Sequence, residues 1–318
     1  MLTDGFGPVL RMAEAFALVA AVAVPVGWAG WRLGRRATPP PLPVPSGDDP
    51  VLAFGYLLVF CAYLVGQAIL GQLAAATGLP QRAATDPDHV GVWQTLVAQT
   101  GAAGLLLGLW ATYRAAFSRP RYWRSALGAV GLGVGGWLIV SPVVYAILGF
   151  ADWASSLVGV VAEEHPLVKV VSSADPGRAV LLFAAVTVAI PFAEEVIFRG
   201  LLLGWLIRRP GWAALPVGIA ALLAISTTAG TTRLMAVGLL LILLAGQVTF
   251  RRRPAVAAVW ATSTLFALVH ASVWPTPVPL FLLGLALGAV TVRSGGVLAG
   301  TVLHGLFNAV SLVYLVRG

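Results

Sequence analysis

The chain has 318 residues, of which 59% are hydrophobic and only 10% charged, and its mean hydropathy is +0.90. About a quarter of the residues of an average soluble domain are charged, so this composition excludes a soluble globular protein and indicates a membrane protein built from helices. The formal charge of +8 does not indicate nucleic-acid binding, because the arginines lie in short clusters between apolar runs and act there as topology signals. The single cysteine, Cys61, excludes an internal disulfide and a cysteine-based metal site.

Apolar segments near or above the ~20 residues that span a bilayer recur along the whole chain. The first is expected to be retained, because Asp4, Arg11 and Glu14 do not form the basic region of a signal peptide. A proline-rich linker, residues 37–50, follows it. The predicted fold is an all-α polytopic transmembrane bundle of about eight to ten spans. The candidate spans are residues 12–33, 51–76, 91–117, 125–150, 178–208, 213–229, 234–250, 255–271, 278–293 and 297–316.

The arginine clusters select one orientation for these spans. Cytoplasmic loops carry the excess of Lys and Arg, and with ten spans thirteen arginines fall on one side and six cations on the other. Both termini are then predicted to face outward. The thirteen are Arg32, Arg35, Arg36, Arg114, Arg119, Arg121, Arg124, Arg208, Arg209, Arg251, Arg252, Arg253 and Arg293.

A longer polar connection, residues 151–177, divides the chain into two regions. Residues 1–177 are predicted to be an N-terminal transmembrane region of four spans and an outer loop. Residues 178–318 form the second region, which contains nearly all the polar residues that lie deep in apolar helices. Those residues are Glu194, Glu195, Arg199, His270, His304 and Asn308. Charges inside a membrane cost several kcal/mol unless they are paired or hydrated, so a functional site is the default hypothesis for them.

The spacing of the charges separates the two glutamates. Glu195 and Arg199 are four residues apart, so on a helix they lie on one face and form an ion pair. Glu194 is rotated by ~100° from Glu195, and its neighbour four residues on is Phe198. Glu195 is therefore interpreted as structural and Glu194 as the carboxylate available for chemistry.

The remaining polar residues complete a set suited to hydrolysis. His304 and Asn308 are four apart on the last span, and His270 follows Phe266 by four at the end of another. A carboxylate and a histidine can hold and deprotonate a water, while a second histidine and an amide can stabilise an oxyanion. A site of this kind requires both imidazoles within about 10 Å of Glu194, so that one water can bridge them.

The three motifs resemble a known family. EExxxR from Glu194 to Arg199, FxxxH from Phe266 to His270 and HxxxN from His304 to Asn308 occur in the order seen in the CAAX-protease and bacteriocin-processing family of membrane proteins, which includes Rce1 and the prokaryotic Abi proteins. The resemblance covers about residues 178–318.

The resemblance implies an intramembrane glutamic endopeptidase that needs no metal. Glu194 would be the general base and His270 would help to orient the water, while His304 and Asn308 would form the oxyanion hole. Glu195, Arg199 and Phe266 would support the site. One departure from the family pattern is a predicted two-span hairpin at about 212–250, between the first and second motifs, and it puts any transfer of substrate preference in doubt.

Other interpretations stay open from the sequence. Spacing alone also permits a zinc site with one glutamate and two histidines. A proton-coupled transporter would use buried carboxylates and histidines as relays, and a non-catalytic family member would act as a scaffold or immunity factor. For an endopeptidase, we expect as partners the bilayer and a membrane-tethered or lipidated protein or peptide, and no nucleic acid. The bias toward Ala, Gly, Arg and Pro suggests a bacterial chain, which predicts a multi-pass protein of the inner membrane.

Overall fold

The computed structural model describes residues 7–34, 69, 76, 123–160 and 176–317. The proline-rich linker and, apart from residues 69 and 76, the candidate spans 51–76 and 91–117 lie outside the described residues.

Each of the other eight candidate spans is helical, and the described ranges contain no strand. Seven of these helices are long and apolar enough to cross a membrane, and α11 is a shorter apolar helix. The predicted all-α polytopic bundle is therefore confirmed for this part of the chain. Its elements are α1 (Gly7–Gly34), α4 (Trp123–Ser156), α6 (Pro176–Ala184), η1 (Ala185–Ala189), α7 (Ile190–Glu195), η2 (Val196–Leu203), α8 (Gly204–Arg208), η3 (Pro210–Trp212), α9 (Ala214–Thr227), α10 (Gly230–Phe250), α11 (Pro254–Leu268), α12 (Pro277–Ser294) and α13 (Leu298–Arg317).

Proline and glycine set the ends of several helices. Pro254 and Pro277 open α11 and α12, where the missing N–H costs no helical hydrogen bond. Gly295 ends α12 in the left-handed conformation, with φ of 65°, and its N–H donates to Thr291 O at 3.0 Å. Short turns of this kind make neighbouring helices antiparallel.

The predicted span 178–208 is one continuous helical rod from α6 to α8, and it contains two π-helical segments, η1 and η2. Pro191 explains η1. A proline has no N–H and its ring clashes with the carbonyl four residues earlier, so the register widens here and Ile190 N–H donates to Ala185 O, five residues back. The two π segments enclose α7, which carries both glutamates at its end.

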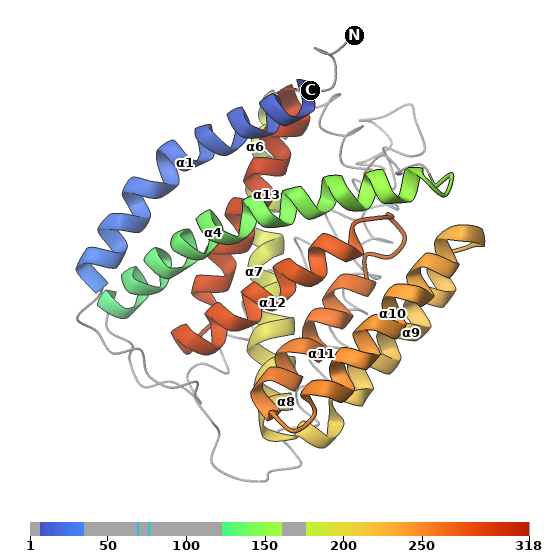
Figure 1. The fold of residues 1–318 in the computed structure, drawn as a ribbon. Coiled ribbons are helices and arrows are strands. Elements are labelled where there is room, and N and C mark those ends of the chain that lie inside the picture. The colour runs from blue at the N-terminus through green and yellow to red at the C-terminus, as the bar shows by residue number, and fades with distance from the viewer. Residues whose placement is uncertain (1–6, 35–68, 70–75, 77–122, 161–175, 318) are drawn as a thin grey trace.

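The described N-terminal helices pack directly on the C-terminal ones. α1 and α4 pack against each other, and α4 also packs along α12 and α13 (Figure 1). Phe16 stacks on Trp137 at 4.6 Å and Tyr145 on Phe307 at 4.8 Å. The described part of region 1–177 therefore shares a core with the second region.

The hairpin of α9 and α10 packs on α11. Large side chains on the outer face of α10 are exposed and apolar, as expected for contact with lipid: Leu234, Leu241, Ile242 and Val248.

The described helix ends place the arginine clusters on one side of the bundle. In Figure 1 the C-terminal ends of α1, α8, α10 and α12 lie away from the beginning of α1 and the end of α13, which are close together at the top. Arg32 is in the last turn of α1 and Arg293 in that of α12, Arg209 follows α8, and Arg251 follows α10. The orientation of this side toward the cytoplasm stays a prediction.

Candidate active site

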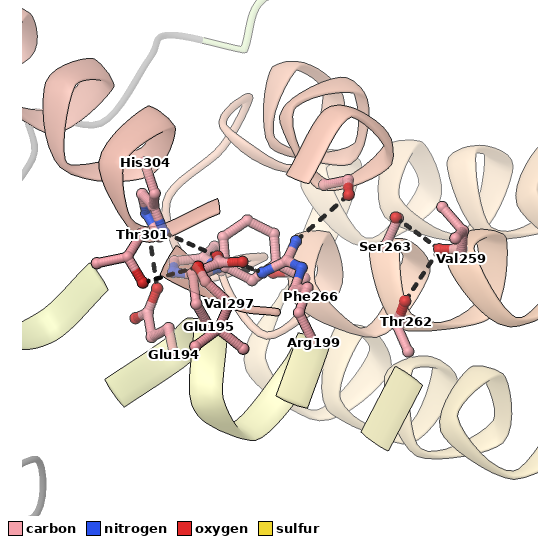
Figure 2. A network of polar contacts seen from close by, with 12 residues as sticks. Glu194, Glu195, Arg199, Val259, Thr262, Ser263, Phe266, Val297, Thr301 and His304 are labelled. Atoms are coloured by element: carbon pink, nitrogen blue, oxygen red, sulfur yellow. Dashed lines mark hydrogen bonds and ion pairs between the residues drawn. The ribbon is translucent and has the colours of Figure 1, made fainter. Parts of the chain in front are cut away.

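A buried ion pair forms the centre of the polar cluster (Figure 2). Arg199 Nη1 lies 2.9 Å from Glu195 Oε1, and both side chains are fully buried. The guanidinium also lies 4.3 Å from the centre of the Phe266 ring, and its Nη2 donates to Gly284 O at 3.5 Å. The pair expected from the i, i+4 spacing is present, and the aromatic ring and the carbonyl of α12 give the buried cation further partners.

His304 lies between the two glutamates. Its Nδ1 is 3.2 Å from Glu195 Oε1, and its Nε2 is 3.7 Å from Glu194 Oε2. Since a carboxylate only accepts hydrogen bonds, a neutral His304 carries its proton on Nδ1, donates to Glu195 and leaves the lone pair of Nε2 facing Glu194. Glu195 thus fixes the tautomer and ring orientation of His304, as carboxylates do in many hydrolytic sites.

The two glutamates differ in exposure as well as in partners. Glu195 is fully buried, whereas the Glu194 side chain keeps 15% of its surface exposed. Glu194 is therefore the carboxylate that a water or substrate can approach.

Among the described residues, His270 contacts the cluster through Phe266. It lies beyond the end of α11, which stops at Leu268 rather than at 271 as predicted. Its Nδ1 is 2.8 Å from Phe266 O, so Nδ1 donates to its own helix. The imidazoles of His270 and His304 contact the Phe266 ring at 5.3 and 5.7 Å. Among the described residues, the hydrogen bonds and ion pairs of the glutamates join them to Arg199 and His304 and not to His270.

Asn308 lies one turn after His304, on the same face of α13. Its Nδ2 donates to Val186 O at 3.0 Å. One of the two amide hydrogens is therefore already used by the π segment η1.

Sequence reasoning missed Gly300, which limits the space beside Glu195. A Cβ atom added to Gly300 would lie 2.7 Å from Glu195 Oε2 and 3.1 Å from Thr291 Oγ1, so only glycine lets the carboxylate approach α13 this closely. Glu195 Oε2 and Thr291 Oγ1 are both buried, and neither atom forms a hydrogen bond within the described structure. The glycine four residues before His304 could have predicted a close helix contact there, because intramembrane helices approach closely at small residues.

A zinc site would need three or four ligands that converge on one point. No group of three or more His, Cys, Asp or Glu residues in the described ranges is arranged to hold a metal ion. The oxygen of Glu195 nearest to His304 is also 2.9 Å from the Arg199 guanidinium, whose positive charge opposes a second cation there.

Comparison with known proteins finds one family model that matches part of the chain. Residues 176–250 and 235–310 match the family model described as type II CAAX prenyl endopeptidase Rce1-like. This part of the chain is therefore similar to the Rce1-like family. The match runs from the start of α6 to the residues that follow Asn308 in α13, so it contains all three motifs. The same comparisons match no curated protein and no solved structure.

The Rce1-like match confirms the resemblance drawn from the motifs and supports an endopeptidase in a multi-pass membrane protein. The catalytic type, the substrate and the roles of single residues are not part of that finding.

Proposed function

We propose that this chain is an intramembrane endopeptidase that cleaves a membrane-tethered or lipidated protein or peptide, with a water activated by Glu194 and His304. The observation that carries the proposal is the placement of His304 Nε2, 3.7 Å from Glu194 Oε2, with Nδ1 held by Glu195. Two hydrogen-bond acceptors face each other there, and a water that donates one hydrogen to each satisfies both.

The proposed reaction needs only groups present in the chain. The water oxygen attacks the peptide carbonyl carbon while one of its protons passes to Glu194. The tetrahedral intermediate then expels the amine, which receives that proton from Glu194, and the carbonyl carbon keeps the new oxygen as a carboxylic acid. His304 holds the water until it attacks, because Glu195 prevents the imidazole ring from turning.

The structure favours a change from the roles that the resemblance implies. His304, rather than His270, is the imidazole with a polar contact to Glu194, and His270 contacts the Phe266 ring. We therefore assign His304 to the water and His270 to the approach of the substrate. The zinc, transporter and scaffold alternatives gain no support from the contacts or from the family match.

A cleavage assay in proteoliposomes tests the proposal. Farnesylated CAAX peptides and unprenylated peptides with the same sequence are supplied to the wild type, Glu194→Gln and Glu14→Gln, and the products are identified by mass spectrometry. The lone Glu14→Gln change in α1 is the matched control. We expect cleavage by the wild type and the control and a loss of at least ~10²-fold with Glu194→Gln. Equal rates for all three proteins contradict the proposal, and inhibition by a chelator that zinc reverses favours the metal alternative.

A further inference from the structure

Pro191 leaves two backbone carbonyls without their usual helical donors. In an α-helix Thr187 O accepts a hydrogen bond from residue 191, and proline has no N–H to supply it. Val186 O accepts one from residue 190, but Ile190 N–H donates to Ala185 O in the π register of η1. A free carbonyl within a membrane costs several kcal/mol unless another group satisfies it.

Helix α13 meets both carbonyls. Asn308 Nδ2 donates to Val186 O at 3.0 Å, and Thr187 O lies so close to Gly305 that a Cβ atom there would overlap it. Gly305 and Asn308 are three residues apart and therefore lie on one face of α13. The amide replaces the lost donor, and the glycine makes room for the other carbonyl.

We propose that Pro191, Gly305 and Asn308 form a clamp that fixes the broken helix against α13, which makes Asn308 a positioning residue. The same face of α13 carries His304, which contacts Glu195 and Glu194. α13 therefore holds the rod at two points, Val186 before the glutamates and Glu195 at the end of α7. The clamp sets the separation of Glu194 and His304 Nε2, and this effect on catalysis rests on the proposed function.

A double-mutant cycle between Pro191 and Asn308 tests the clamp. Asn308→Ala should lower the melting temperature of the detergent-solubilised protein by about 2–5 °C and kcat by on the order of 10- to 100-fold, with KM changed less. Pro191→Ala restores the missing N–H. In the Pro191→Ala background, Asn308→Ala should lower the melting temperature by less than half as much as it does in the wild type. It should leave kcat within about threefold of the Pro191→Ala value.

Pro25→Ala is the matched control, since Pro25 is an exposed proline inside α1. It should not reduce the effect of Asn308→Ala. The clamp is wrong if Pro191→Ala leaves the melting-temperature loss unchanged. If Pro191→Ala removes the effect of Asn308→Ala on the melting temperature but not its effect on kcat, the positioning role is wrong. Asn308 would then act on the reacting oxygen itself.

Hydrogen exchange provides a second measurement that needs neither activity nor Pro191→Ala. If Asn308 holds η1, peptides covering residues 183–195 should exchange faster in Asn308→Ala than in the wild type, and peptides from α9 and α10 should not change. Unchanged exchange at 183–195 overturns the clamp even in a chain that shows no peptidase activity. Equal cleavage by wild type and Glu194→Gln would instead contradict the proposed function alone.

Discussion

At the residue scale, Glu194 and Glu195 have different surroundings. Glu195 is enclosed by Arg199, His304 and the backbone of Gly300, whereas Glu194 contacts His304 and remains partly exposed. Their substitutions should therefore fail in different ways.

The first prediction separates the two glutamates. Glu195→Gln leaves Arg199 as an uncompensated buried charge, which costs on the order of 3–5 kcal/mol, so both folded yield and activity should fall. Glu194→Gln should accumulate normally and lose turnover by at least ~10²-fold. The double change Glu195→Gln with Arg199→Gln should recover much of the yield. Detergent-stable yield and initial rate are measured for each, and the opposite pattern means that the roles are reversed.

The second prediction concerns the space beside Glu195. Gly300→Ala places a methyl group 2.7 Å from Glu195 Oε2, which should push the carboxylate toward His304 and Arg199 and cost about 1–3 kcal/mol. Gly204→Ala, in the same rod as Glu195, meets nothing within 4 Å and is the matched control. The unfolding midpoint in detergent should fall for Gly300→Ala only, and equal midpoints would show that the pocket can relax.

The sequence predicted the Glu195–Arg199 pair because an i, i+4 spacing on a helix allows few other outcomes. It did not predict that Glu195 orients His304, since contacts between α7 and α13 depend on how the two helices cross. Pro191 was a readable signal for a carbonyl that needs a donor from another helix, and Asn308 is the only asparagine of the chain.

At the scale of elements, the apolar lengths predicted the spans well, but hydrophobic periodicity does not distinguish a regular α-helix from one with short π segments. η1 and η2 were therefore not predicted, although π segments occur often at functional sites. The end of α11 before His270 was missed because the apolar run continues to Ala271.

The third prediction concerns the contact between α10 and α11. Trp260 donates to Leu243 O at 2.8 Å and packs against Phe281 at 4.8 Å, and a Cβ atom on Gly246 would overlap its ring. Gly246→Ala should detach the hairpin from α11, lowering the unfolding midpoint and making α10 more accessible to proteases.

Gly238→Ala, in the same helix, meets nothing within 4 Å and should be neutral or slightly stabilising, because alanine favours helix more than glycine. Equal protease resistance of both variants would mean that the Trp260 ring can move aside.

At the scale of the whole molecule, the arginine clusters predict that the turn before α9 is cytoplasmic and the turn after it is outside. Gly211 and Ala229, exposed residues in these two turns, are each replaced by cysteine in a Cys61→Ser background. A membrane-impermeant thiol reagent should label Ala229→Cys in intact cells and Gly211→Cys only after permeabilisation. The reverse labelling would invert the predicted orientation.

The placement of the charged cluster has a consequence for biosynthesis. The ribosome delivers Glu195 and Arg199 to the membrane more than a hundred residues before His304 and Asn308. Until α13 is inserted, the glutamates of the rod from α6 to α8 lack their contact with His304, and its Val186 carbonyl lacks the hydrogen bond from Asn308. A bilayer disfavours such unpaired polar groups. We therefore expect insertion of this rod to finish only when α13 joins it, so that Glu194 and Glu195 gain their contacts with His304 in a bundle that is already closed.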